Sequence, residues 1–290
     1  MATFQQALNL HQERWREAHG HPIGTQPIVP RPGGPKPRAI GARIPLEYAR
    51  QTGANFISPT ARDAAAARLA AKESNQSLDH QRLWVDLASS VALCFNLFGD
   101  LAADLRLADR ALHRLWTDVP GTVCQVRFQH SPGWLDPGYL GNLVAFDVAF
   151  VLDLGGGQRG ILGVETRYQE RPERREPKPE RLTRYLEVAE RSRLFTPEAI
   201  AAVNGTDLLV MWLEHLLVQS MLQHPSDTWR WGRLVYLHPS INRGFADACA
   251  RYRSLLRDPS SFAPMTIEDV LDSGALPSTT AAAVRERYIP

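Results

Sequence analysis

The spacing of hydrophobic and polar positions changes twice along this chain. Between residues 80 and 117 the apolar positions recur every three or four residues. This predicts a helix over about His80–Gly99, with Gly99 as its stop, and another over about Leu101–Thr117. Residues 123–169 instead contain three short runs rich in β-branched and aromatic residues, which predict strands. After these runs the helical spacing returns.

The remaining segments complete a mixed pattern of helices and strands. The same criteria predict a strand at 233–239 and helices at 3–18, 59–73, 178–194, 206–223, 241–257, 266–274 and 278–288. Three consecutive strands, then helices, then another strand indicate an α/β domain. We expect a mixed central sheet flanked by helices, with extra helices at the N- and C-terminal ends.

Residues 20–45 form a proline-rich segment. Seven prolines fall in this stretch, and proline lacks the amide donor that helices and sheets need. The segment also carries Arg31, Lys36, Arg38 and Arg43. A solvated tether is the interpretation we favour, and a basic strap along a phosphate backbone is the alternative. The sequence thus predicts an N-terminal helix and arm over 1–45 and one domain over 46–290, with its core at about 80–240.

Composition narrows the function classes. A net charge of +2 and a pI near 8.5 do not by themselves indicate nucleic-acid binding. The three cysteines form no short-spaced pair, and the first residues do not resemble a signal peptide, so a cytoplasmic protein is expected. The apolar stretch around Glu214 and His215 predicts a buried helix rather than a membrane span. No phosphate loop, dinucleotide fingerprint or serine elbow occurs, so no small-molecule cofactor is expected.

Two of the predicted strands bring charged residues together. The runs at 143–154 and 159–169 flank Gly155–Gly157, which predicts a hairpin. A three-residue loop at these glycines places Asp147 opposite Glu165 on one face, with Cβ atoms ~5 Å apart. Arg167 follows two positions later on the same face. A four-residue loop would misalign the faces, so this prediction depends on the loop length.

A carboxylate among apolar strand residues needs a partner, because its burial alone is unfavourable. Asp147 lies within such a stretch, LVAFDVAFV. Two interpretations are open. In the first, Asp147 forms a buried or half-buried ion pair with Arg167. In the second, Mg²⁺ or Mn²⁺ lies between the opposed carboxylates, since hard cations prefer oxygen ligands. In the second case Arg167 points to the place where phosphate charge develops.

Asp147 followed by Glu165-Thr166-Arg167 resembles the PD-(D/E)XK nuclease superfamily, which places an aspartate on one strand and E-x-K on the next. The surrounding segments resemble a bacterial restriction-endonuclease-like branch of it. They are LASSVALCFNLFGDL (87–101), AFDVAFVLDLGGGQRGILGVETRYQE (145–170), RYLEVAERSRLF (184–195), WLEHLLVQSMLQ (212–223) and LVYLHPSIN (234–242). The resemblance spans about residues 45–272 and implies a restriction-endonuclease-like fold.

The resemblance also implies roles for the hairpin residues. Asp147 and Glu165 would bind Mg²⁺ or Mn²⁺, with the backbone carbonyl of Thr166 as a further ligand. Arg167 stands where the family has lysine. The chain has only three lysines against 30 arginines, which favours a functional replacement. Arginine nevertheless stays protonated and cannot act as a base, so the departure equally permits an inactive site.

Four further residues are accessory candidates. The helix before the sheet often supplies another acid in the family, here Asp86, although a solvated helix position is the interpretation we favour. Gln169 extends the second strand past the site, where it could touch substrate. His215 and Gln219 share a helical face and could reach the site or the DNA backbone. Hydrogen-bonded polar residues of the core are the interpretation we favour for both.

Two functions therefore stand as hypotheses. The first is a metal-dependent endonuclease that hydrolyses DNA phosphodiester bonds, with a role in restriction or defence by analogy to the family. Double-strand cleavage would need a homodimer or paired nicks. The second is a catalytically inactive nuclease-fold protein that binds nucleic acid or a protein partner. Arg167 is the main support for the second hypothesis.

Overall fold

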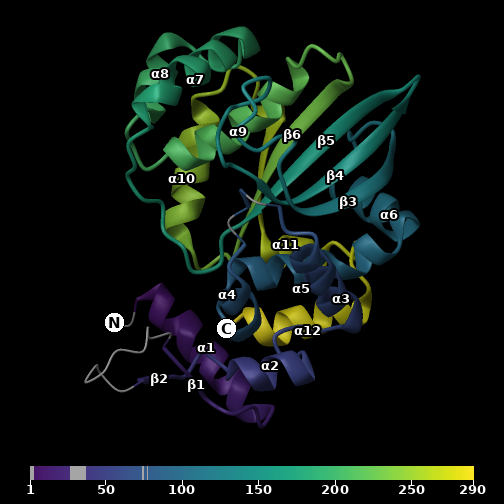
Figure 1. Ribbon diagram of the computed structural model, residues 1–290, viewed down its shortest axis with the longest axis vertical. Coiled ribbons are helices and arrows are strands. Elements are labelled where there is room, and N and C mark those ends of the chain that lie inside the picture. The colour runs from purple at the N-terminus through teal and green to yellow at the C-terminus, as the bar shows by residue number, and fades with distance from the viewer. Residues whose placement is uncertain (1–2, 27–36, 74, 77) are drawn as a thin grey trace.

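The structure is a computed structural model that describes residues 3–26, 37–73, 75–76 and 78–290. A five-stranded mixed sheet forms the centre of the molecule (Figure 1). The strand order is β3-β4-β5-β6-β7, with β3, β4 and β5 antiparallel and with β6 and β7 added in parallel. The strands are β3 (Thr122–His130), β4 (Phe146–Gly155), β5 (Gln158–Thr166), β6 (Trp229–His238) and β7 (Phe262–Thr266). The predicted α/β class with a mixed sheet is confirmed.

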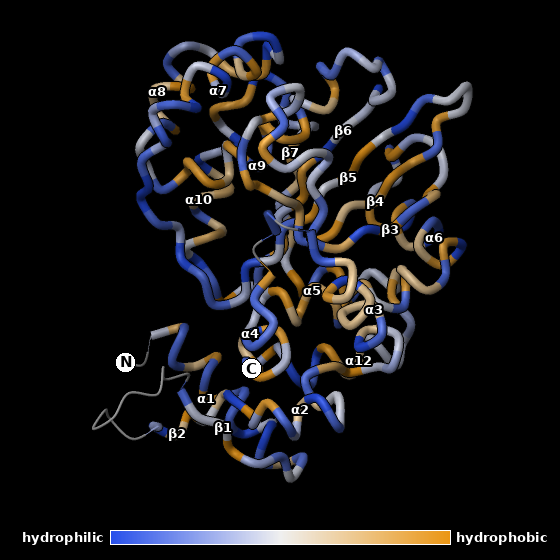
Figure 2. Tube along the Cα trace, viewed as in Figure 1, coloured by the Kyte–Doolittle hydropathy of each residue, from blue (hydrophilic) through white to orange (hydrophobic). Residues whose placement is uncertain are grey.

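Helices cover both faces of this sheet and make two apolar cores. One core includes residues of α3 (Pro59–Ala70), α5 (Ser90–Ala103), α6 (Leu105–Leu115), α11 (Ile267–Asp272) and α12 (Ser278–Tyr288). The other includes residues of α7 (Pro179–Ser192), α8 (Pro197–Val203), α9 (Leu209–Leu222) and α10 (Arg243–Ser254). The strands between them are largely apolar, as expected for a sheet buried on both faces (Figure 2).

The N-terminal elements pack below the sheet (Figure 1). They are α1 (Phe4–Ala18), the paired strands β1 (Gly24–Thr25) and β2 (Ala39–Ile40), α2 (Leu46–Thr52) and α4 (His80–Val85). Helix α1, which lies within the predicted 3–18, begins at a Thr3 capping box and contacts α12. Arg31 and Lys36 of the predicted basic arm lie outside the described residues. The division of the chain at residue 45 stays a prediction.

The predicted helix over His80–Gly99 is wrong, because the chain forms two helices there. Helix α4 ends before Asp86, whose carboxylate accepts the Ala88 amide at 3.1 Å. Ser89 then caps α5 by accepting the Ala92 amide at 3.4 Å. Short polar side chains compete with the helix for backbone amides, and two of them within four residues interrupt it.

Gly99 is also not a helix stop. Helix α5 continues to Ala103, and a Cβ at Gly99 would lie 2.5 Å from Cα of Ala61 in α3. The glycine therefore permits the close approach of the two helices. The next helix begins at Leu105 rather than Leu101, since Asp104 caps it through the amides of Arg106 and Leu107.

The hairpin between β4 and β5 has the predicted register but a different turn. Val148 pairs with Val164 and Asp153 with Arg159, the register that places Asp147 opposite Glu165 one position further. The turn itself has two residues, Gly156 and Gly157, both with positive φ (60° and 79°). Gly155 pairs with Gln158, so the ladder shifts by one position at Leu154. This one-residue bulge restores the register that a three-residue loop would have given.

Several short elements were not predicted. They are the paired strands β1 and β2, helices α2 and α8, the 3₁₀ turn η1 (Pro259–Ser261) and strand β7. Pro264 interrupts the strand pattern of β7, and proline is tolerated there because β7 is an edge strand of the sheet. Among the described helices, none combines the length and apolar character needed to cross a membrane.

Candidate active site

Asp147 lies near the start of β4, where hydrogen bonds from two neighbouring strands fix its carboxylate. Oδ2 accepts from the Thr166 amide at 2.9 Å and from the Thr166 hydroxyl at 2.8 Å. Oδ1 accepts from the side-chain amide of Gln129, at the end of β3, at 2.9 Å. The hairpin register places Thr166 and Glu165 beside Asp147, so the predicted proximity of Asp147 and Glu165 is present in the fold. Such a carboxylate is oriented before any ligand arrives.

Arg167 sits among three carboxylates. Its Nη2 lies 3.0 Å from Oε2 of Glu165 and 2.5 Å from Oε1 of Glu214, and its Nη1 lies 3.5 Å from Oδ2 of Asp147. Nη1 also donates to the backbone carbonyl of Thr166 at 3.1 Å. The guanidinium therefore contacts both predicted acids and the carbonyl that the family resemblance implied as a ligand.

Glu214 is the member of this cluster that sequence reasoning missed. It projects from α9, and its second oxygen accepts a hydrogen bond from the hydroxyl of Tyr236 on β6. The Tyr236 ring also lies under the Arg167 guanidinium, 5.3 Å from its centroid. A charged residue inside the apolar stretch LLVMWLEHLLV was the available signal, because buried charges need partners. Taken alone, the charge of Glu214 indicates a buried helix rather than a membrane span and does not identify its partners.

Burial governs the protonation of the cluster. Burial, followed by the nearby Glu214 and Asp147 carboxylates, raises the pKa of Glu165 well above its usual range. Burial also raises the pKa of Glu214, although Arg167 opposes that shift. Burial disfavours the charge of Arg167, but Glu214, Tyr236 and the other acids outweigh it and raise the pKa of Arg167. Arg167 therefore remains a cation and supplies charge rather than a proton acceptor.

The cluster opens onto a cleft of about 650 Å³. The acids and Arg167 line one wall together with Tyr236. Three further arginines line the same cleft: Arg82, Arg171 and Arg175. Gln5 of α1 reaches its rim and donates to the backbone carbonyl of Gln169 at 2.8 Å. A polar cleft with both acids and arginines can hold a cation beside a phosphate group.

The donor set suits a hard divalent cation in charge and atom type. Oε1 of Glu165 is buried and has no hydrogen-bond partner among the described residues. Three ionised carboxylates and one guanidinium would leave two negative charges uncompensated in a buried place. Within the described part of the chain, however, no three acidic, histidine or cysteine residues are arranged as a ready-made metal centre. Asp147 and Glu165 thus fit two ligand positions, the remainder falling to water and substrate oxygens.

Of the four accessory candidates, Gln169 lines the cleft and Asp86, His215 and Gln219 do not. Gln169 lines the cleft, with its side-chain oxygen accepting from Asn9 of α1 at 3.3 Å. Asp86 lies outside the cleft lining and pairs with Arg43 at 3.6 Å and Arg82 at 3.8 Å. Burial raises the pKa of Asp86 despite these two arginines. Asp86 is thus a partly buried ion-pair partner, which differs from the solvated position favoured for it.

His215 and Gln219 are residues of α9 that lie in the core. Both are buried, and neither lines the cleft. Nδ1 of His215 is 2.9 Å from the hydroxyl of Tyr252. Glu214 and His215 are adjacent on α9 but point in different directions, since successive helix residues diverge by about 100°. The placement agrees with the interpretation of the two residues as polar members of the core.

Paired carboxylates beside a fixed cation can hold a divalent metal and stabilise phosphate charge, which is the chemistry of a metal-dependent phosphodiester hydrolase. A family model described as the PD-(D/E)XK nuclease superfamily matches residues 2–290, so this chain belongs to that superfamily. Searches of curated proteins and of solved structures found no match.

Proposed function

We propose that this protein is a metal-dependent endonuclease that hydrolyses DNA phosphodiester bonds in the cleft beside β4 and β5. The observation that carries the proposal is the convergence of Asp147, Glu165 and Arg167 at one wall, with Oε1 of Glu165 unpartnered. Superfamily membership supports a nuclease, and the DNA substrate and metal dependence are the finer parts of the proposal.

Each residue has a distinct task in this proposal. Asp147 and Glu165 would hold Mg²⁺ or Mn²⁺, which when bound activates water and neutralises phosphate charge. Thr166 and Gln129 orient the Asp147 carboxylate. Arg167 faces the scissile phosphate as a permanent cation and stabilises its developing charge. The Arg171 and Arg175 side chains on the cleft wall are suited to phosphates flanking that bond.

The test is cleavage of supercoiled plasmid and of single-stranded DNA with Mg²⁺ or Mn²⁺. The variants are Asp147→Asn, Glu165→Gln and Arg167→Lys, with Asp153→Asn as control, because Asp153 is on the same strand and pairs with Arg159 at 2.6 Å. We expect cleavage in wild type and Asp153→Asn and its loss in the first two variants. Metal-dependent cleavage that survives both of those substitutions would refute the assignment.

A specific contact favours a second function, a nuclease-fold protein that binds nucleic acid or a partner without cleaving. Arg167 already contacts the acids and the carbonyl of Thr166 that would hold a metal. On this alternative, wild type binds no Mn²⁺ at millimolar concentration in calorimetry and cleaves no DNA. Cleavage that appears only in Arg167→Lys would then identify a site disarmed at that position.

A further inference from the structure

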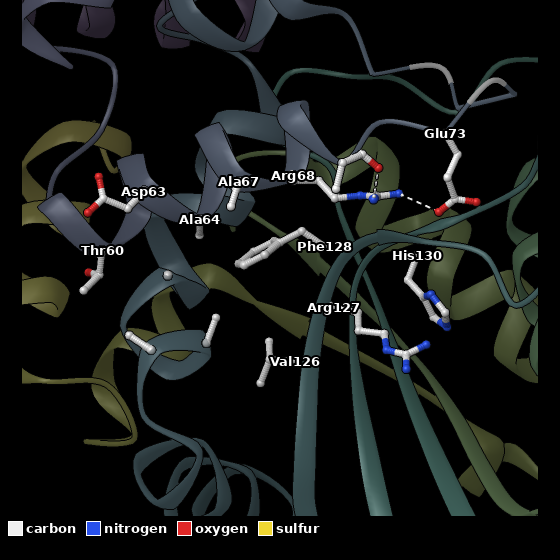
Figure 3. Close-up of a pocket in the computed structure, with 14 residues that line it drawn as sticks. Thr60, Asp63, Ala64, Ala67, Arg68, Glu73, Val126, Arg127, Phe128 and His130 are labelled. Atoms are coloured by element: carbon white, nitrogen blue, oxygen red, sulfur yellow. Dashed lines mark hydrogen bonds and ion pairs between the residues drawn. The ribbon is translucent and has the colours of Figure 1, made fainter.

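A second cavity lies at the free edge of the sheet, and it shares no lining residue with the candidate active site. It has a volume of about 620 Å³ and lies between α3, the end of α5 and strand β3. Figure 3 shows Ala64 and Ala67 of α3 facing Val126 and Phe128 of β3 across it. Small side chains on the helix and larger apolar ones on the strand leave an apolar groove between the two elements.

The groove follows the edge of β3 rather than one of its faces. Val126, Arg127 and Phe128 all line it, although side chains of successive strand residues point to opposite faces. A cavity that touches three consecutive residues must run alongside the backbone. β3 is the first strand of the sheet and pairs only with β4 among the described strands. The groove therefore gives access to an edge that has no partner strand.

The backbone of this edge is capped at its two ends and open between them. The Val123 amide donates to Asp109 at 2.8 Å. The Gln129 carbonyl accepts from Arg68 at 3.3 Å and from Gln76 at 3.1 Å. Within the described part of the chain, no group outside the sheet bonds to the backbone of residues 124–128. A row of free donors and acceptors is a template for a further strand.

One end of the groove carries unsatisfied nitrogen atoms and positive charge (Figure 3). Nε2 of His130 and Nε of Arg68 are buried without partners among the described residues, and His130 is only 9% exposed. Burial, with Arg127 and Arg68 nearby, lowers the pKa of His130 to about 3, so its ring is neutral. Arg68 is paired with Glu73 at 3.3 Å, whereas Arg127 has no ion pair within the described structure. This end is complementary to a carboxylate.

We propose that this groove binds an extended peptide segment of a protein partner. The segment adds a strand to the open edge of β3, places apolar side chains against Ala67 and Phe128, and puts a carboxylate beside Arg127. Main-chain hydrogen bonds supply affinity in this mode of recognition, and the apolar groove supplies selectivity. Helix α3 has 12 residues, a length of ~18 Å that matches about five residues of extended chain.

Charge argues against a second copy of this chain as the occupant. Symmetric antiparallel pairing of two β3 edges would bring Arg127 close to its counterpart, and like charges in cross-strand positions are destabilising. A second copy would also bring its own α3 and α5 to a groove bounded by the same two helices. A single acidic peptide strand meets neither obstacle.

The test begins with a displayed library of random heptapeptides selected on the full-length protein. The tightest selected peptide, labelled with fluorescein, is the probe for anisotropy titrations. Ala67→Trp fills the groove, and Ala66→Trp is its matched control, because Ala66 is on the same helix, exposed and outside the lining. Arg127→Glu reverses the charge at the groove end, with the exposed Arg110→Glu on α6 as its control.

We expect Ala67→Trp to weaken binding by at least about tenfold and Ala66→Trp to change it less than about twofold. Arg127→Glu should weaken binding roughly threefold to tenfold, and Arg110→Glu should not. Hydrogen exchange on wild type requires no variant and should show slowed amides within residues 124–128 when the peptide is bound.

Three results would overturn the proposal. They are a library that yields no peptide distinguishing wild type from folded Ala67→Trp, exchange protection confined to another surface, and a wild-type dimer that Ala67→Trp converts to monomer in ultracentrifugation. The last would identify a second copy as the occupant. None depends on nuclease chemistry, and we expect Ala67→Trp to leave DNA cleavage unchanged.

Discussion

Replacing Arg167 by methionine tests whether the acid cluster is built around a cation. The substitution keeps an unbranched apolar stem and removes a guanidinium that lies 2.5 Å from Glu214 and 3.0 Å from Glu165. The Arg167 side chain is 16% exposed and those of Glu165 and Glu214 are 2% and 7% exposed. Removing one partner of a buried ion pair costs roughly 3–5 kcal/mol, because the remaining charges are uncompensated. We expect Arg167→Met to lower the free energy of unfolding by about that amount at pH 8.

The loss of stability in Arg167→Met should be smaller at low pH and smaller when a divalent cation is bound. The folded-state pKa values of Glu165 and Glu214 are raised, so the folded protein holds protons that the unfolded chain releases. Stability from such groups is greatest below their unfolded pKa values and falls as the pH rises through the folded ones. The variant should therefore be less impaired at pH 5 than at pH 8. A divalent cation at about 100 times its Kd would restore roughly 2.7 kcal/mol.

The assay is urea unfolding followed by tryptophan fluorescence, at both pH values, with EDTA or with Mn²⁺. Arg159→Met is the control, since Arg159 pairs with Asp153 in the same hairpin with side chains 34% and 45% exposed. Its loss should stay below about 1 kcal/mol. Equal losses in the two variants, or an Arg167→Met protein indifferent to both pH and Mn²⁺, would show that the cluster does not depend on a cation.

Three further changes test other parts of the structure. Glu214→Gln removes the charge that holds Arg167, and we expect DNA cleavage to slow by about tenfold to 100-fold through misplacement of the guanidinium; wild-type rates would contradict this role. Burial lowers the pKa of His215 from 6.5 to about 3, so folding loses stability as the pH falls below 6.5. This histidine contributes about 2 kcal/mol of that loss at pH 5, and His215→Phe should lose correspondingly less between pH 7 and pH 5 in urea titrations; an unchanged pH dependence would count against a neutral buried ring. Gly163→Ala would bring a Cβ within 2.4 Å of the Phe146 ring, which should cost about 1–3 kcal/mol, whereas Gly244→Ala, whose nearest neighbour would be 3.7 Å away, should not destabilise, as thermal melts can show.

Local sequence determined the hairpin. Alternation of side chains along 143–154 and 159–169, interrupted by three glycines, predicted a register that the structure confirms, with Asp147 and Glu165 on one face. The physical reason lies in the connection between the strands, because both strands are apolar on both faces and the turn fixes which of their residues pair. The turn could differ in length because a bulge at Leu154 compensated for it.

Helix boundaries were determined locally as well, but by weaker signals. Asp86, Ser89 and Asp104 end or begin helices through hydrogen bonds to backbone amides only two or three residues away. Such residues occur both inside helices and at caps, so they do not by themselves mark a helix end. The regular apolar spacing across residues 80–99 therefore predicted one continuous helix. The role of Gly99, in contrast, is not determined locally, because it depends on the close approach of Ala61 in another helix.

The complete charge cluster was decided only by tertiary structure. Glu214 lies 47 residues from Arg167 in the chain and reaches it because α9 packs across the sheet, with Tyr236 arriving from β6. Asp86 does not line the cleft and instead pairs with Arg43 and Arg82, which its own element did not predict. Period and propensity describe the face on which a residue lies within its own element. They carry no information on which other element that face meets, and the contacts of Glu214 with Arg167 and Tyr236 are of that second kind.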